Sequence, residues 1–409
     1  MLNNSMEKKN KWIGWGLMAT VLIVLSFPIY LVRHQYLEDH SAEMNFEPQF
    51  VGKETCIDCH KVEYDLWTGS DHDLAMDFAN DTSVAGNFDN AEFEYGGQVH
   101  KFYKRNNRYF VYTDGPDGKM QEFEVKYTFG VHPLQQYLIE FPGGRLQTLA
   151  LTWDTISKSW YHMADAVYSD EIVDHTNWLH WTNQAQNWNG MCADCHSTNL
   201  KKGFDLDTKT FNTTWSEIDV SCEACHGPSS EHIKWAHLPE MARPLNTNTG
   251  LVVQTSNIDN RRYVDLCARC HTRRSSLKDY DFDWTDLLDH MIPELPRVPM
   301  YYSDGQILEE DYVFGSFTQS RMYMEDVKCN DCHNVHSGKL IVNGNDLCLQ
   351  CHRSDVYDTY NHHFHKYSGT GSIKVINEFG EESRVGEGAQ CINCHMPGRY
   401  YMERLSPRS

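Results

Sequence analysis

Residues 222–226 read Cys222-Glu-Ala-Cys-His226, and this pattern of two cysteines three apart followed directly by a histidine decides the fold. The pattern occurs seven times in 409 residues and accounts for all 14 cysteines. Its cysteines are Cys56, Cys59, Cys192, Cys195, Cys222, Cys225, Cys267, Cys270, Cys329, Cys332, Cys348, Cys351, Cys391 and Cys394. Its histidines are His60, His196, His226, His271, His333, His352 and His395.

The spacing within each motif suits covalent attachment of a haem. Two cysteines three apart lie on one side of a helical turn, where both sulfurs can form thioethers with the vinyl groups of one porphyrin. The histidine that follows can then present its imidazole to the iron as the proximal ligand. The sequence therefore predicts seven c-type haems, with the 14 cysteines binding the porphyrins and the seven motif histidines binding the irons.

Zinc and disulfides are the two competing interpretations of so many cysteines. Zinc knuckles use two Cys-x-x-Cys pairs for each tetrahedral site, and seven pairs are an odd number. Disulfides are common in exported chains. Neither chemistry requires a histidine directly after every pair, so we expect haem.

The composition agrees with a cofactor-built interior. Hydrophobic residues make up 40% of the chain, below the roughly 45–50% of ordinary globular proteins. Six of the seven motifs share residues 192–395, which leaves too little polypeptide between them for a side-chain core. We expect the haems to form that core and the segment to be largely unfolded without them. A net charge of −21 argues against nucleic-acid binding.

The N-terminus predicts export. Residues 12–32 contain no charged side chain, and 21 residues are long enough to span a bilayer. Lys8, Lys9 and Lys11 precede this run, whereas mostly acidic residues follow it, which places the first residues in the cytoplasm and the rest outside. A cleaved signal peptide is the alternative, but the run lacks the usual small-residue cleavage site. We expect an uncleaved anchor in the cytoplasmic membrane and a haem-binding part in the periplasm or outside the cell membrane.

The chain between the first two motifs has a different pattern. Short aromatic and β-branched runs alternate there with turn formers at Gly96-Gly97, Asn106-Asn107 and residues 114–118, which predicts a small antiparallel sheet over about 90–155. We expect a mainly α-helical and irregular, haem-organised fold with this β segment and one transmembrane helix. The expected segments are a cytoplasmic tip and anchor (1–33), a tether (34–50), the first haem site (51–89), the β-rich insertion (90–155), a six-haem domain (156–403) and a tail (404–409).

Histidines outside the motifs are candidates for the distal side of each iron. His336 lies three residues after a proximal histidine and therefore cannot reach the far side of the same haem, so it would serve a neighbouring one. One member of the His362, His363 and His365 cluster is expected to ligate. The distal candidates are His72, His175, His180, His232, His290, His336 and His363. They saturate seven irons only if His175 and His180 both ligate, and this alternative stays open.

Several segments resemble the multihaem cytochromes of the cytochrome c-554/c-552 type, whose haem packing is related to that of hydroxylamine oxidoreductase. The resemblance covers about residues 50–403. It is carried by Thr55-Cys-Ile-Asp-Cys-His, Ser70-Asp-His-Asp-Leu-Ala-Met, Gly130-Val-His-Pro-Leu-Gln-Gln-Tyr-Leu, Leu179-His-Trp-Thr, Trp188-Asn-Gly-Met-Cys-Ala-Asp-Cys-His and Asp304-Gly-Gln-Ile-Leu, and by the close motif pair at Cys329 and Cys348. The resemblance favours His72, His180, His232, His290 and His336 as distal ligands. Many similar proteins continue into a tetratricopeptide array, and we expect none here.

The resemblance implies periplasmic electron transfer through stacked, mostly bis-histidine haems. Expected partners are a quinol oxidase or other cytochromes. The alternative is an oxidoreductase that acts on a small nitrogen or sulfur compound, such as nitrite, hydroxylamine or tetrathionate, at one five-coordinate haem. No motif replaces its histidine by lysine, the mark of the pentahaem nitrite reductases. The sequence therefore favours an electron carrier over an enzyme.

Overall fold

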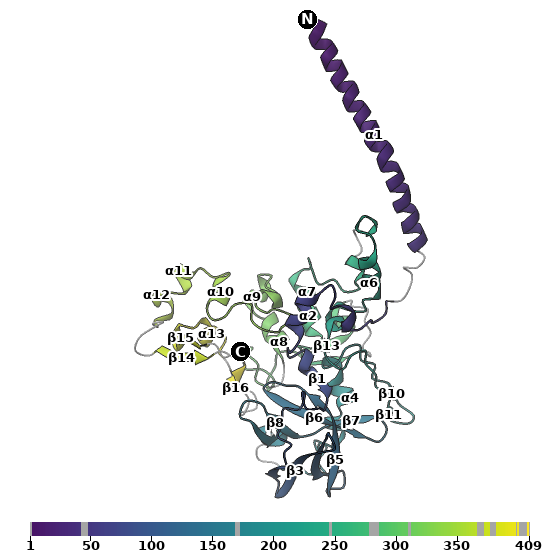
Figure 1. The fold of residues 1–409 in the computed structure, drawn as a ribbon. Helices are drawn as coiled ribbons and strands as arrows, with labels where there is room; N and C mark the ends of the chain where they lie inside the picture. Colours follow the sequence, from purple (N-terminus) through teal and green to yellow (C-terminus); the bar gives the residue numbers. More distant parts are fainter. Residues whose placement is uncertain are drawn as a thin grey trace. The chain divides into compact units, whose positions relative to one another are not determined.

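The computed structural model describes residues 2–41, 48–167, 172–244, 248–277, 286–309, 312–365, 372–376, 382–397, 399–400 and 407–408 (Figure 1). Residues 42–47 of the expected tether and residues 404–406 and 409 of the expected tail lie outside this range. The chain forms two compact units. The first combines Met1–Val51 with His226–Gln254, and the second combines Gly52–Cys225 with Thr255–Ser409.

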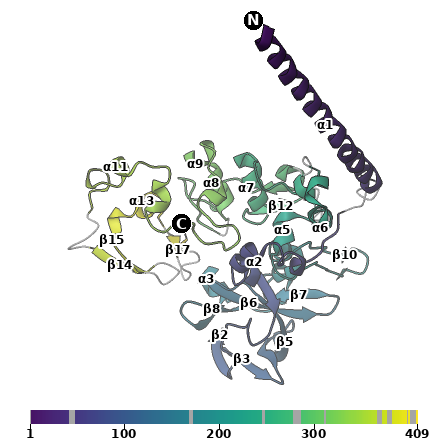
Figure 2. The same cartoon turned by 45° about the horizontal axis from the view of Figure 1, so that its top comes forward.

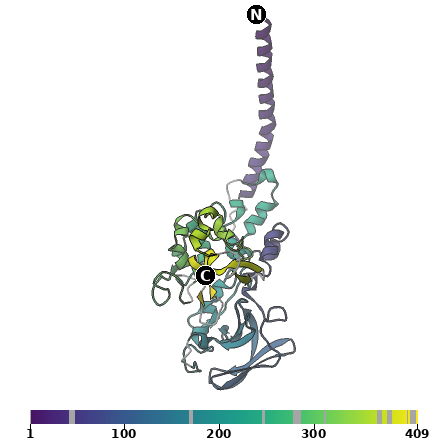
Figure 3. The same ribbon diagram turned by 90° about the vertical axis from the view of Figure 1, so that its left-hand side faces the viewer.

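The first unit contains the apolar N-terminal run. This run lies in α1 (Leu2–Ser41), one continuous helix in Figure 3. Its segment Trp15–Gln35 has a mean hydropathy of 2.1, and it could cross a membrane by length and composition, a test that a signal sequence also passes. The unit also contains α6 (Ser230–His237), η6 (Glu240–Ala242) and η7 (Asn248–Gly250). Two hydrogen bonds join Gln49 to Ser230, at 3.1 and 3.0 Å.

The second unit is built on a nine-stranded antiparallel sheet, and the prediction of a mainly helical fold is wrong. Helix accounts for 33% of residues and strand for 22%, and the sheet is nearly closed. The strand order is β2-β3-β4-β5-β6-β8-β9, with β1 on β5 and β7 on β6. The strands are β1 (Met76–Phe78), β2 (Ala91–Tyr95), β3 (Gln98–Arg105), β4 (Arg108–Asp114), β5 (Met120–Phe129), β6 (Leu134–Phe141), β7 (Arg145–Thr148), β8 (Leu151–Asp154) and β9 (Ser159–His162).

The turn residues identified in the sequence join consecutive strands. Gly96 and Gly97 link β2 to β3, and both have positive φ (58° and 77°). Asn106 and Asn107 link β3 to β4 in the same way (52° and 57°). Two consecutive positive φ angles define the type I′ turn, whose twist matches that of antiparallel strands. The sheet is larger than the expected segment because β1 and β9 also join it.

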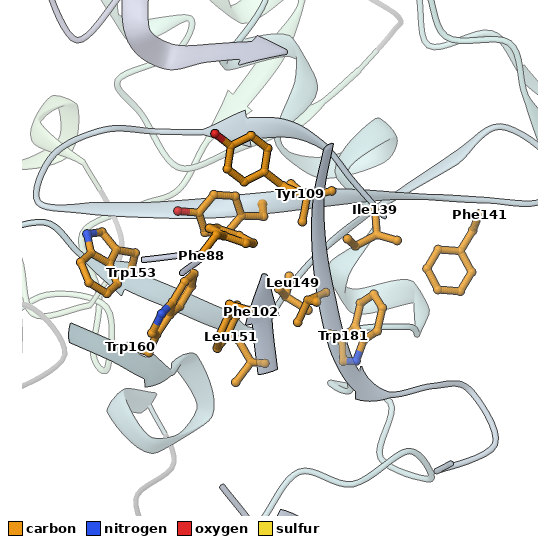
Figure 4. Close-up of a cluster of buried hydrophobic side chains, with 13 residues drawn as sticks. Phe88, Phe102, Tyr109, Ile139, Phe141, Leu149, Leu151, Trp153, Trp160 and Trp181 are labelled. Carbon is orange, nitrogen blue, oxygen red and sulfur yellow. The ribbon is translucent and has the colours of Figure 1, made fainter. Parts of the chain in front are cut away.

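Aromatic side chains fill the sheet's core (Figure 4). Phe88 contacts Phe102, Tyr109, Tyr137 and Trp160 edge-on, with ring centroids 5.1–5.7 Å apart. Phe102 also stacks on Trp160 at 3.6 Å. Such packing gives the sheet a core of side chains alone, unlike the cofactor-built interior that we expect around the motifs.

Short helices and small strand pairs make up the rest of the second unit. The helices are α2 (Lys61–Trp67), α3 (Met163–Val167), α4 (Trp188–Met191), α5 (Cys222–His226, which ends in the first unit), α7 (Asn260–Ala268), α8 (Val313–Thr318), α9 (Arg321–Met324), α10 (Asp346–Leu349), α11 (Ser354–Tyr357), α12 (Tyr360–His363) and α13 (Cys391–His395). The strand pairs are β10 (Phe204–Asp205) with β11 (Thr210–Phe211), β12 (Arg274–Ser276) with β13 (Met291–Pro293), β14 (Ser372–Ile376) with β15 (Glu382–Gly386), and β16 (Arg399–Tyr400) with β17 (Pro407–Arg408). In Figure 2, α7, α8 and α9 follow one another from right to left, and α13 and α11 lie farther to the left.

Replacing Phe102 by alanine should loosen the sheet. Phe102 is fully buried, and removing a buried phenylalanine costs about 3–5 kcal/mol. In hydrogen–deuterium exchange measured by mass spectrometry, peptides from β3–β6 should exchange about a hundredfold faster or more. Val99→Ala on the same strand is the control, since Val99 is 44% exposed. Equal exchange in the two variants would contradict the packing described here.

Candidate haem-binding sites

Each Cys-x-x-Cys-His motif folds as a tight turn. In four motifs of the second unit, the amide of the histidine donates to the carbonyl of the first cysteine, four residues back, over 2.9–3.0 Å; these cysteines are Cys56, Cys267, Cys329 and Cys348. Around Cys192 the turn is tighter, and His196 donates to Ala193 over 3.3 Å. One helical turn brings residues three and four apart onto one side. Both sulfurs and the imidazole can therefore face a single porphyrin.

The motif cysteines fit covalent haem attachment because no disulfide uses any of the 14 sulfurs. Several lie against a cysteine of another motif without forming a disulfide. Numbering the motifs 1 to 7 along the chain, hydrogen-bonding contacts join motifs 1 and 3 (Cys56–Cys222), 2 and 4 (Cys195–Cys270), 4 and 5 (Cys267–Cys329), and 6 and 7 (Cys348–Cys391). Electrostatic interactions, without a hydrogen bond, link motifs 3 and 4 (Cys225–Cys270) and motifs 5 and 6 (Cys332–Cys351).

These contacts define an order that differs from the order along the chain. The series runs 1–3–4–5–6–7, and motif 2 lies beside motif 4. Motif 4 is therefore the only motif among these contacts that has three neighbours.

Two proximal histidines are held in the form that binds iron. Loss of contact with water lowers the pKa of the half-buried His196 to about 4, so this imidazole is neutral near pH 7. Neutral imidazole is the metal-binding form. The Nδ1 of His196 lies 3.4 Å from the Ala75 carbonyl, and the Nδ1 of His333 lies 3.3 Å from that of Gly338. A carbonyl can only accept, so Nδ1 carries the proton in each ring and Nε2 is left for a metal.

Two motif histidines face a histidine from outside the motifs at the same distance. The ring centroids of His72 and His271 are 6.1 Å apart, and so are those of His362 and His395. Two metal–imidazole bonds of about 2 Å each, together with the ring radii, give a centroid separation of about 6 Å. The predicted candidate His72 therefore lies where a distal ligand of the motif 4 iron would lie.

His175 and His180 lie against the sheet. His180 is 2% exposed, its Nε2 hydrogen-bonds with Asp114 over 2.9 Å, and its Nδ1 lies 2.9 Å from the Thr182 hydroxyl. The ring of His175 packs against Gly118, so closely that a Cβ there would lie 2.6 Å from Nδ1. Both histidines thus occupy sites shaped by the sheet's own residues.

The other predicted distal candidates lie in separate elements. In the first unit, His232 on α6 hydrogen-bonds through Nδ1 to the Thr249 carbonyl over 2.7 Å. His290 ends η8 (Leu287–Asp289), and its carbonyl accepts from Leu277. The amide of His336 donates to Asn334. The Nδ1 of His363 accepts from the amide of His365 over 3.2 Å.

Sequence reasoning missed the polar contacts that bind motif 1 to motif 3. The Gly52 amide donates to Glu223 over 2.9 Å, the Trp67 indole donates to the Val220 carbonyl over 3.0 Å, and Lys53 pairs with Asp219. Glu223 is fully buried, and the Asp219 side chain is 5% exposed. Burial raises the pKa of Asp219 to about 6, against the lowering effect of Lys53. More than 150 residues separate the partners in each contact, so no local pattern could reveal them.

Comparisons with known proteins agree with the motifs. A family model described as a doubled CXXCH motif matches residues 323–357, and one described as cytochrome c554 and c-prime matches residues 154–227 and 347–405. The crystal structure of the outer cell wall cytochrome OcwA has a similar fold, with a TM-score of 0.52 and 16% identity over 85% of this chain and 77% of that chain. An undecahaem cytochrome from the S-layer of Carboxydothermus ferrireducens matches with a TM-score of 0.43 and 15% identity, over 88% and 52% of the two chains. No curated protein sequence matches.

Replacing Lys53 by methionine should weaken the junction of motifs 1 and 3. The change leaves the buried Asp219 carboxylate without its cation, which typically costs 3–5 kcal/mol. The decrease in the free energy of unfolding should be largest near pH 8 and smaller near pH 5. Asp219 takes up a proton in the folded state as the pH falls through its raised pKa, and a neutral carboxyl group does not need the cation. The measurement is denaturant unfolding followed by the Soret band at both pH values.

Lys61→Met is the matched control for this change. Lys61 pairs with Asp65 on the same short stretch of chain, but both side chains are more than half exposed, and exposed pairs contribute about 0–1 kcal/mol. An equal decrease in the free energy of unfolding in both variants, or no decrease in Lys53→Met, would contradict the structural role assigned to the buried pair.

Proposed function

We propose that this chain, which belongs to the multihaem c-type cytochromes, is a seven-haem electron relay that works outside the cytoplasm. Each haem, when bound, supplies a reversible one-electron couple at its iron. The protein's part is to hold seven such groups in one connected series and to fill the axial positions of their irons. An iron with two histidine ligands has no open position and exchanges electrons only.

The connected order of the motifs is the observation that carries this proposal. Every motif touches at least one other through its cysteines. Cysteines that touch would place their porphyrins next to each other, because a thioether to a former vinyl group holds the ring two bonds from the sulfur. The electrostatic interactions of motif 3 with motif 4 and of motif 5 with motif 6 link these contacting groups, and haems at all seven motifs would then give electrons a continuous route.

The burial pattern also supports haem as the core of the C-terminal region. Among the residues of 312–365 and 386–397 whose burial the structure describes, Ala389 is the one buried hydrophobic residue. The sheet, in contrast, buries a cluster of 13. Roughly 25 cal/mol per Å² of buried apolar surface stabilises a fold, and this region buries very little of its own. Porphyrins at motifs 5, 6 and 7 would supply the missing apolar contacts.

We further propose that α1 anchors the chain in the cytoplasmic membrane with the motifs outside. The support is the charge-free run of residues 12–32 with lysines before it, and the requirement for export that c-type haem attachment imposes. A cleaved signal peptide would export the chain equally well. The name of the structural neighbour OcwA places that protein in the outer cell wall, also outside the cytoplasm. Electron donors would be a quinol oxidase or another cytochrome.

The bonding of His180 favours a second candidate function. Its Nε2 is engaged with Asp114 inside the sheet, so it is not directed at an iron. If the distal candidates fall one short of seven, one iron keeps an open position. Such a haem could reduce or oxidise a small nitrogen or sulfur compound, as an enzyme would.

Low-temperature EPR of the fully oxidised protein, with and without nitrite or hydroxylamine, distinguishes the two functions. The relay predicts seven low-spin irons whose signals do not change on either addition. One high-spin iron that shifts with an added compound would instead establish the open site of an enzyme.

The number of haems can be counted directly. A pyridine haemochrome assay should give seven haems per chain, and a Cys391→Ser/Cys394→Ser variant should give six, because the two sulfurs of one motif hold one porphyrin. A wild-type value clearly below seven at full loading would overturn the seven-haem relay.

A further inference from the structure

The C-terminal part of the second unit brings four aromatic rings into a row that links motif 6 to motif 7. The ring of Tyr357, at the end of α11, lies 5.5 Å from that of His352 and 5.5 Å from that of His362, edge-on to both. The ring of His362, on α12, lies 6.1 Å from that of His395, and the two planes differ by only 7°. Figure 1 shows α10, α11, α12 and α13 grouped in the same region of the second unit.

The spacing of His362 and His395 is wider than that of directly stacked rings. Tyr95 and His162, in the sheet, are parallel within 2° with centroids only 3.6 Å apart, the distance of direct stacking. The two parallel histidines are 2.5 Å farther apart (6.1 minus 3.6 Å). Their separation equals that of His72 and His271, which also pairs a motif histidine with one outside the motifs. Two imidazoles bound to one metal at about 2 Å each have this spacing.

The neighbouring histidines are less suited to the same role. The Nδ1 of His363 accepts the amide hydrogen of His365 over 3.2 Å. A neutral ring whose Nδ1 accepts must carry its proton on Nε2, and a protonated nitrogen cannot bind a metal. The ring of His365 instead packs against Gly388, so closely that a Cβ there would lie 2.3 Å from it.

Hydrogen bonds fix the segment that carries this pair. Asn345, just before α10, accepts from the amide of Cys391 over 3.0 Å, and its side chain donates to the Ala389 carbonyl over 2.8 Å and to Asp358 over 2.9 Å. One side chain therefore connects motif 6, the turn between α11 and α12, and the start of motif 7. These bonds fix the position of α12 relative to α13, so that His362 faces His395.

We infer that His362 is the sixth ligand of the iron at motif 7, opposite His395, and that Tyr357 bridges this iron's ligand to His352 of motif 6. The inference rests on the proposed attachment of a haem at Cys391 and Cys394. It replaces the expected ligand His363 by its neighbour. It also makes the last two haems a unit in which Tyr357 contacts an axial ligand of each.

The ring planes give this site a spectroscopic signature. Each imidazole donates π density into the iron d orbital perpendicular to its own plane. Two imidazoles with parallel planes act on the same iron d orbital and raise its energy well above that of the other π-type d orbital. This large energy difference gives a rhombic low-spin EPR spectrum. Rings near a right angle act on different orbitals and give a strongly axial spectrum with a large maximum g value. The 7° of His362 and His395 predicts the first kind, and the 66° of His72 and His271 is closer to the second.

The test is a set of variants in the full chain, each loaded with haem. His362→Ala should keep the wild-type haem count, lose one rhombic low-spin signal and gain one high-spin iron that added imidazole converts back to low spin. His363→Ala, one residue away, should leave the EPR spectrum unchanged. His362→Met should keep a six-coordinate iron with the red absorption band of methionine ligation and a raised reduction potential at one haem. This variant keeps the test decisive if the alanine variant folds poorly.

Three outcomes would overturn the inference. A high-spin iron in His363→Ala but not in His362→Ala would assign the ligand to His363. An unchanged spectrum in both variants would remove α12 from the coordination of any iron. A His362→Met variant that loads haem but has neither the methionine band nor a raised potential would exclude residue 362 from the axial position. Failure of the proposed function is distinguishable, because it would appear in the wild-type protein as a haemochrome count below seven.

Discussion

The single turn formed by Cys-x-x-Cys-His is the constraint on which the rest of the structure depends. The turn needs only five residues and one hydrogen bond from the histidine amide to the first cysteine carbonyl, as in Cys267–His271. Because it fixes two sulfurs and an imidazole together, a large cofactor can be held by very little polypeptide. The chain can then place such turns against one another, and the contact of Cys267 with Cys329 shows how closely it does so.

The second unit therefore has two kinds of interior. The sheet is an ordinary protein core, in which rings such as Phe88, Phe102 and Trp160 pack edge-on or face to face. The C-terminal motifs, by contrast, have few buried side chains among the residues whose burial is described, and they rely on turns, backbone hydrogen bonds and polar connectors such as Asn345. The two regions meet where β1 pairs with β5 and the Ala75 carbonyl, just before β1, faces His196. A rigid sheet can thus orient a proximal histidine.

Local features of the fold could be predicted from the sequence, and long-range features could not. The motif spacing was sufficient to identify the cofactor class, and Gly96-Gly97 and Asn106-Asn107 indicated two turns, which the structure shows to have the φ angles of type I′ turns. The fold class was predicted wrongly because the motifs dominated the interpretation, and because β1 and β9 are only three and four residues long. Strands this short have no periodicity of their own and form because β5 and β8 pair with them.

The ligand candidates show the same limit. Sequence distance cannot choose between His362 and His363, since they are adjacent, whereas the orientation of α12 turns only His362 toward His395. Similarly, nothing near His180 in the sequence indicates Asp114, which is 66 residues away and belongs to β4. The order of the motifs, with motif 3 beside motif 1 and motif 2 beside motif 4, likewise depends on contacts that only the folded chain makes.

The central claim is that these motifs hold one connected series of haems, and the positions of the irons test it most directly. Anomalous scattering from crystals of the haem-loaded protein would locate every iron without reference to the polypeptide. The account predicts seven irons in the order 1–3–4–5–6–7, with the iron of motif 2 beside that of motif 4 and neighbouring porphyrins close enough to touch. An iron set apart from the others, or a series that follows the chain order 1–2–3–4, would contradict it.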